Sequence, residues 1–195
     1  MRLSLNAKSL ILGVLMVFLM PVCAYPEISG SDTPDVKVLT AETILSGNDY
    51  ILNANIDFQL SHKATEALRN GVPLFWTYQF KVEEQNNLLW NTTLIEKSFM
   101  YRIQYHALLN MYRVRNESYG TVENFSTLQA ALDMLSTLQD FHLIEKASID
   151  ENKNHVVGIK ITFERDALPL PLRPVAYLSP QWYLSSDWYL WPLKK

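Results

Sequence analysis

Few residues in this 195-residue chain have the types and spacing that chemistry needs. The four histidines lie on separate segments, and none has a second metal-binding residue at the short spacing of a zinc site: His62, His106, His142 and His155. His106 differs from the others because Arg102 and Arg113 flank it. Two interpretations of His106 stay open: a half-buried ring bonded to backbone, or a catalytic or pH-sensing group.

The other chemical candidates are weaker. Ser185-Ser186-Asp187 has hydrolase residue types but no Gly-x-Ser-x-Gly elbow, so a turn between two aromatic strands is predicted instead. Cys23, the only cysteine, lies in the leader region, and the six glycines form no phosphate-binding loop. The sequence therefore assigns no catalytic residue, no cofactor and no metal, and it favours a role that is not enzymatic without deciding the question.

The first 24 residues have the three parts of an export signal. Arg2 and Lys8 precede the apolar stretch Leu10–Met20, and small residues precede a cleavage point after Ala24. The stretch is shorter than the ~20 residues that span a bilayer as a helix. We expect cleavage and a periplasmic or secreted protein. Two alternatives would keep the chain on the membrane: an uncleaved inner-membrane signal anchor, or lipidation of Cys23.

Charge and composition limit what the exported part can be. The net charge of −3 becomes more negative once the basic leader is removed, and this argues against a nucleic-acid partner. Residues 25–35 contain prolines, glycine and serine and are expected to form a flexible arm. Residues 36–195 have the length of one globular domain.

Alternation of apolar and polar residues is the dominant pattern in this domain. It predicts strands over residues 50–60, 74–82 and 157–163, each with one buried face. Residues 94–111 also fit a strand better than a helix, with a β-bulge after His106-Ala107, where the apolar phase shifts. Helices are predicted over 61–70, capped by Ser61 and ended by Gly71, and over 126–138, with Ser126 and Gln129 as a capping box.

The remaining segments complete a mainly β fold that borders on α+β. Residues 141–149 and 155–163 are expected to form a hairpin, and the prolines of 168–174 to impose an extended edge or crossover. A last strand pair is expected within 181–191. Taken together, the predicted strands and helices indicate an antiparallel β-sandwich with two short helices.

Three tryptophans near the C-terminus are candidates for contact with a partner: Trp182, Trp188 and Trp191. Core packing, a partner or ligand interface, and a membrane-interface belt are the alternatives for this cluster. Together with Arg102, His106 and Arg113, the three tryptophans make up the partner or ligand surface that the sequence predicts.

Several motifs resemble a known bacterial family of exported proteins. They are Met100–Leu108 with Tyr112-Arg113-Val114, Phe125–Leu128 with Ala130-Ala131-Leu132, Leu168-Pro169 with Pro171-Leu172, and Trp182–Tyr189. The family is catalogued as domain of unknown function 4390. Leu109 stands where the family usually has threonine, and Arg165-Asp166-Ala167 replaces an Asp-Thr-Ser-like run. The resemblance implies export in proteobacteria, no assigned activity, and genes beside a membrane sensor kinase of a two-component system.

These observations lead to one expected function and two alternatives. We expect an envelope domain that binds a protein or small ligand, as an accessory to two-component signalling, with an envelope protein such as a membrane sensor kinase as partner. The alternatives are a hydrolase-type enzyme with its site near His106 and a purely structural envelope protein.

Overall fold

The computed structural model describes residues 34–86 and 90–195. The expected export signal with Cys23, and nearly all of the expected arm, lie outside the described residues. The described residues belong to one compact unit, Asp32–Lys195. None of the helices that the structure describes has both the length and the apolarity needed to cross a membrane.

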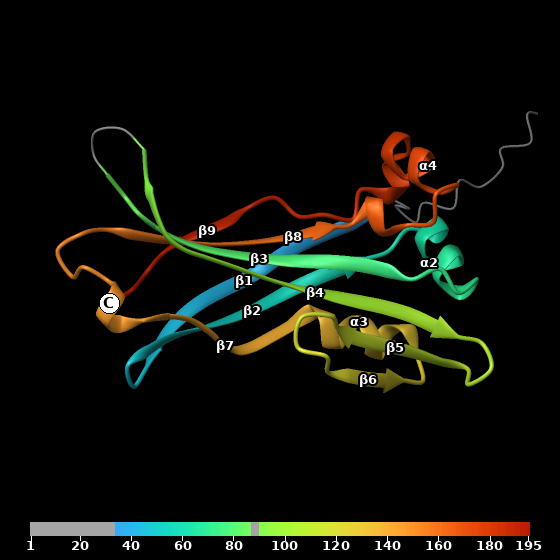
Figure 1. Ribbon diagram of the computed structural model, residues 1–195, viewed down its shortest axis with the longest axis horizontal. Coiled ribbons are helices and arrows are strands. Elements are labelled where there is room, and N and C mark those ends of the chain that lie inside the picture. The colour runs from blue at the N-terminus through green and yellow to red at the C-terminus, as the bar shows by residue number, and fades with distance from the viewer. Residues whose placement is uncertain (1–33, 87–89) are drawn as a thin grey trace, which may run out of the picture. The chain divides into compact units, whose positions relative to one another are not determined.

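Two antiparallel sheets form the domain (Figure 1). The smaller sheet has the order β1 (Asp35–Ser46), β2 (Asp49–Gln59), β7 (Thr137–Glu145). The larger sheet has the order β6 (Val122–Phe125), β5 (Met111–Asn116), β4 (Thr92–His106), β3 (Leu74–Glu84), β8 (His155–Phe163), β9 (Tyr189–Pro192). The predicted fold class, a mainly β antiparallel sandwich, is confirmed.

Period-two alternation builds the core between the sheets. Strand β3 alternates buried and half-exposed residues along its whole length, and the strands predicted at 50–60, 74–82 and 157–163 correspond to β2, β3 and β8. The inner residues of β3 pack among aromatic rings from both sheets and neighbouring strands. Tyr78 donates its hydroxyl to the carbonyl of Leu135 at 2.6 Å, and burial raises the pKa of Tyr78 well above its usual value.

Both helices predicted from the sequence are present, α2 (His62–Arg69) and α3 (Leu128–Ser136). Ser61 caps α2, because its Oγ accepts from the Ala64 amide at 3.0 Å, and Gly71 follows the helix with a φ of 84°. The cap of α3 is Thr127, whose Oγ1 accepts from the Ala130 amide at 3.2 Å. The capping box predicted one residue earlier, at Ser126, is therefore wrong.

The β-bulge predicted after His106-Ala107 is also wrong. His106 ends β4 and pairs with Met111, the first residue of β5, so residues 107–110 form a tight hairpin turn. Asn110 adopts a φ of 49°, which asparagine tolerates better than most residues. A hairpin turn and a bulge shift the apolar phase in the same way, and the sequence pattern could not separate them.

Strand pairing differs from prediction at two further places. Strands β7 and β8 do not form a hairpin: β7 pairs with β2 in the smaller sheet, and β8 pairs with β3 and β9 in the larger one. The loop between them carries the chain from one sheet to the other. In the predicted strand pair at 181–191, the structure has a 3₁₀ turn, Pro180–Trp182, and a single strand, β9.

Residues 168–172 of the proline-rich segment form turns that lead into a short helix, instead of the predicted extended edge or crossover. Helix α4 (Arg173–Leu178) has Pro174 in its first turn, where the missing N–H costs no hydrogen bond. After α4, Ser185 and Ser186 run beside β8 instead of forming the predicted turn. The Ser186 Oγ accepts from the Ile161 amide at 2.9 Å, and the Ser185 Oγ accepts from the Phe163 amide at 2.8 Å.

Candidate functional site

The β4–β5 hairpin places arginine side chains on the outer face of the larger sheet. The inward residues Ile103 and Val114 are buried and pair with each other, so their strand neighbours point outward. Arg102 pairs with Arg115, and Gln104 pairs with Arg113, which brings the three guanidinium groups onto the same face on alternate rungs. Helix α3 packs against the inner side of the sheet, since its Leu135 carbonyl accepts a hydrogen bond from the buried Tyr78 hydroxyl. We call Arg102, Arg113 and Arg115 the cationic face.

The cationic face carries more positive charge than its neighbours neutralise. Glu117 lies between two of the arginines: its Oε1 is 2.9 Å from Arg102 Nε, and its Oε2 is 3.4 Å from Arg115 Nε. Arg113 donates to the neutral Oδ1 of Asn124 at 3.0 Å and forms no ion pair within residues 34–86 and 90–195. Of the three guanidinium groups, two therefore share one carboxylate and the third has none.

An apolar tip adjoins the cationic face. Leu108 is fully exposed and Leu109 is largely exposed, at the centre of the four-residue turn that joins β4 to β5. The Tyr105 hydroxyl donates to Asn110 Oδ1 at 2.7 Å and ties the turn to the strand before it. Two adjacent exposed leucines on a braced turn are unusual for a solvated loop and suit a contact surface.

His106 lies between the tip and the arginines, on the same outer face as Arg102. Its Nε2 is buried without a hydrogen-bond partner, and its ring forms no side-chain hydrogen bond within the part of the chain that the structure describes. The structure therefore brings together three of the six predicted surface residues: Arg102, His106 and Arg113.

The three tryptophans lie at separate places. Trp188 is on the outer face of the larger sheet, where the Lys81 ammonium is 4.6 Å from the centre of its ring. Strand β3, which carries Lys81, lies between β8 and β4, so Trp188 is separate from the cationic face. Trp191 donates from Nε1 to Thr43 Oγ1 on β1 at 3.0 Å. Trp182 is buried against Phe163, with ring centroids 6.0 Å apart. The sequence grouped them by their spacing, whereas the topology separates them.

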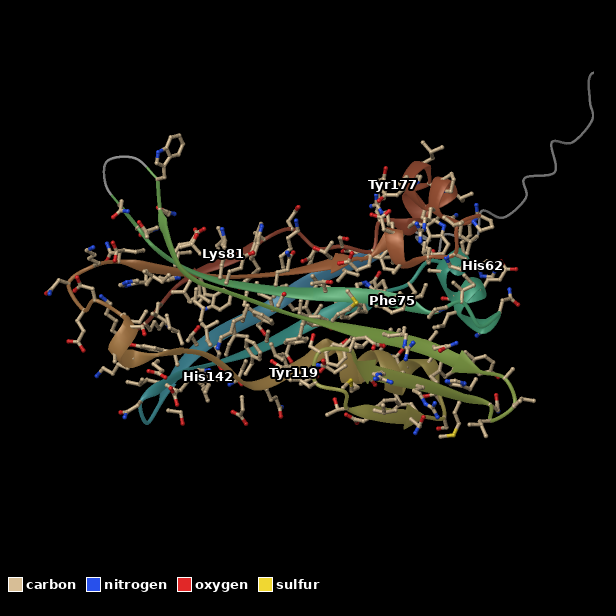
Figure 2. The ribbon with its side chains drawn as sticks, in the orientation of Figure 1. His62, Phe75, Lys81, Tyr119, His142 and Tyr177 are labelled. Carbon is tan, nitrogen blue, oxygen red and sulfur yellow. The ribbon has the colours of Figure 1, made fainter. Side chains whose placement is uncertain are left out.

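A polar cluster that sequence reasoning missed joins three distant segments. His142 Nε2 lies 3.1 Å from Asp49 Oδ1, and Lys97 Nζ lies 3.1 Å from His142 Nδ1. Lys97 also donates to the His142 carbonyl at 3.0 Å. Figure 2 shows His142 near one end of the sheets, far from His62. No sequence signal marks this cluster, because its members come from three strands that only the sheet topology brings together.

A hollow of about 730 Å³ lies beside Asp49, at the turn between β1 and β2 and the segment after β7. It is lined by Asn48, Asp49, Glu145, Lys146, Ala147, Ile149 and Glu151. His142 and Asp49 are about half exposed, so water screens their interaction. Among the described residues no group of three or more histidine, cysteine, aspartate or glutamate side chains could hold a metal ion. We treat this cluster as a cross-link between the two sheets.

His155 is the most deeply buried histidine that the structure describes. It is 2 % exposed, and neither ring nitrogen has a hydrogen-bond partner among the described residues. Its strand partner Glu84 instead pairs with Lys153, whose Nζ is 2.6 Å from the carboxylate. Burial of the imidazole therefore costs the desolvation of two ring nitrogens, and no hydrogen bond among the described residues offsets that cost.

We expect His155→Leu to leave the free energy of unfolding unchanged or to raise it by about 1 kcal/mol, because leucine removes two unpaired polar atoms from the core. Urea denaturation at neutral pH measures this. His142→Leu is the matched control: it removes a half-exposed, paired histidine and is expected to be neutral or mildly destabilising. A loss of more than 2 kcal/mol in the His155 variant alone would show that the ring has an essential partner.

Comparison with known proteins identifies the family. No curated protein and no solved structure matches the chain. One family model covers residues 33–192, which includes the cationic face, the apolar tip and all three tryptophans. The resemblance carried by the Met100–Leu108 motif is thus confirmed, and the chain belongs to the family described as Domain of unknown function (DUF4390).

Proposed function

We propose that this protein is an exported envelope domain that binds an acidic segment of another envelope protein through the cationic face and the Leu108-Leu109 tip. One observation carries the proposal: of three guanidinium groups on the outer face of the β4–β5 hairpin, two share a single carboxylate and the third has no ion pair among the described residues. The chain as a whole is acidic, so this concentration of positive charge is local.

The chemistry of the surface suits a protein partner. Arginine binds carboxylates through paired hydrogen bonds and is enriched where interfaces concentrate their binding energy. Leucines at the tip would supply the apolar contact that charge alone lacks, and adjacent Met111 extends the apolar area along β5. A partner segment with two or more carboxylates next to apolar side chains would match both parts.

The family resemblance and the leader sequence support a specific partner and compartment. The leader has the order of charge, apolar stretch and small residues that directs export, which favours the periplasm. Association of the family with a two-component system favours a membrane sensor kinase as the protein bound. In this proposal the domain is an accessory to signalling. The ring of His106 has no hydrogen-bonded neighbour within the described chain, which gives the hydrolase alternative no supporting contact.

In vivo photocrosslinking tests the proposal. A photoreactive residue at Gln104, which lies on the rung of Arg113, should capture one specific envelope protein. Adding Arg113→Glu should reduce that capture at least tenfold, because the reversal replaces attraction by repulsion at a site that has no ion pair of its own. Raising the salt concentration in a purified binding assay should weaken the complex.

Lys160→Glu is the matched control. Lys160 lies on β8 of the same sheet, pairs with Gln79 and is half-exposed. Its substitution by glutamate therefore reverses a charge on the same sheet but away from the hairpin. Capture should survive this change. Equal losses in the two variants, or no specific product from position 104, would contradict the proposal.

A further inference from the structure

An apolar groove lies between α2 and α4, and none of its lining residues belongs to the cationic face. It has a volume of about 290 Å³, and its apolar lining comes from Ala67, Val72, Leu172, Val175 and Trp182. Figure 1 shows the two helices at the same end of the sheets. We call this hollow the α2–α4 groove. It is independent of the proposed function, because it shares no residue with the β4–β5 hairpin.

Trp182 gives the groove an unsatisfied hydrogen-bond donor. The side chain lines the groove, is 2 % exposed, and its Nε1 has no acceptor among the described residues. The indole nitrogens of Trp76 and Trp191 each have an acceptor, at 2.9 and 3.0 Å. An N–H buried without a partner costs about 1–3 kcal/mol, and an oxygen from an occupant would recover part of that cost. Because this nitrogen is out of contact with solvent, such an oxygen reaches it only by separating the side chains that cover it.

The rim of the groove adds a charge and an apolar extension. Lys63 and Glu66 both line the groove, and Lys63 forms no ion pair in residues 34–86 or 90–195. Val175 is 44 % exposed, and Leu178, three residues along the same helix, is 84 % exposed. Residues three apart share a helix face, so the apolar surface continues outward from the groove.

The size of the groove selects one acyl chain. A water molecule occupies about 30 Å³ in the liquid, and a methylene group is of similar size, so 290 Å³ holds roughly ten carbon atoms. A lipid with two chains exceeds this volume. A single chain would fill the apolar lining, continue along Leu178 if longer, and place a carboxylate near the unpaired ammonium of Lys63.

The geometry points to the α2–α4 groove as a binding site for a free monoacyl carboxylic acid of medium chain length. In this site the apolar lining buries the chain, Lys63 binds the carboxylate, and the Trp182 N–H donates to a carboxylate oxygen once the side chains that cover it move apart.

Titration of the purified domain with decanoate tests the site. Calorimetry gives the affinity, and the indole N–H resonances report which tryptophan responds, with Trp182→Phe assigning one of them by its disappearance. We expect saturable binding below the concentration at which decanoate forms micelles, with a change in the Trp182 resonance. Trp182→Phe should weaken binding three- to tenfold, since it removes one hydrogen bond to a charged group and keeps the apolar ring.

Two valines provide a matched pair of variants. Val175→Glu places a carboxylate at the groove and should weaken decanoate binding at least tenfold. Val122→Glu makes the same change on β6, where the valine is 45 % exposed, and should leave the affinity within twofold. Circular dichroism confirms that both variants are folded. Decanol should bind more weakly than decanoate, and Lys63→Ala should abolish that preference.

Three outcomes would overturn the inference. Equal weakening by the two glutamate variants would show nonspecific partition of the acid. Binding to phosphatidylglycerol vesicles without binding to decanoate would make a bilayer the true occupant. An unchanged Trp182 resonance at saturation would place the acid elsewhere. None of these results affects the photocrosslinking at position 104, so the two proposals fail separately.

Discussion

Trp76→Ala is expected to lower the free energy of unfolding by about 3–5 kcal/mol, the range for removing a large buried aromatic side chain. Trp76 has no exposed surface and contacts the rings of Phe58 and Phe163 at centroid distances of 5.5 and 5.3 Å. Its Nε1 also donates to the Leu184 carbonyl at 2.9 Å, which links β3 to the segment before β9. Urea denaturation followed by circular dichroism measures the loss.

The neighbouring residue is the control for this substitution. Phe75 precedes Trp76 on β3 and points to the outer, half-exposed face of the sheet (Figure 2). Phe75→Ala should cost about 1 kcal/mol, within the span of strand propensities. Trp76→Phe separates the hydrogen bond from the packing and should fall between the two. A cost for the Phe75 variant equal to that of Trp76→Ala would mean that the core is not where the structure places it.

The second large effect is expected from the two serines beside β8. Ser185→Ala combined with Ser186→Ala should lower the free energy of unfolding by about 2–5 kcal/mol, because the amides of Phe163 and Ile161 lose their acceptors. A buried N–H that loses its partner costs about 1–3 kcal/mol. The Ser186 amide still donates to the Ile161 carbonyl at 2.8 Å, so the segment should remain in place. Urea denaturation of the single and double variants measures each contribution.

Ser98→Ala serves as the control for the serine variants. Ser98 lies on β4, is exposed, and forms no side-chain hydrogen bond within the described residues, so its change should be neutral within about 0.5 kcal/mol. A double variant as stable as the parent protein would remove the structural role that we assign to both hydroxyls. It would also reopen the hydrolase interpretation of Ser185-Ser186-Asp187.

Local patterns predicted the strands and helices well because each depends on neighbouring residues. Alternation in β3 reflects one face in the core, and the cap at Ser61 needs only the Ala64 amide three residues on. The errors share a different cause. A hairpin turn after His106 and a β-bulge give the same phase shift, and proline at the start of a helix looks like proline at a sheet edge.

Pairing between strands could not be predicted, because it depends on which distant segment completes the core. The β7 strand pairs with β2, far back in the sequence, and not with β8, which follows it. That choice unites Asp49, Lys97 and His142. A cluster of side chains that come from two sheets therefore cannot be predicted from the spacing of residues in the sequence.

The sequence by itself determined the residues of the candidate surface on β4 and β5, the β class and the family. Arg102, His106 and Arg113 come together because they lie within twelve positions, close enough for one hairpin to align them. The tertiary structure decided what that proximity means: which face is outward, that Glu117 neutralises only part of the charge, and that Leu108 stands exposed beside it. It alone also placed Trp182 beneath the α2–α4 groove, because helices distant in the sequence meet only when the sheets pack.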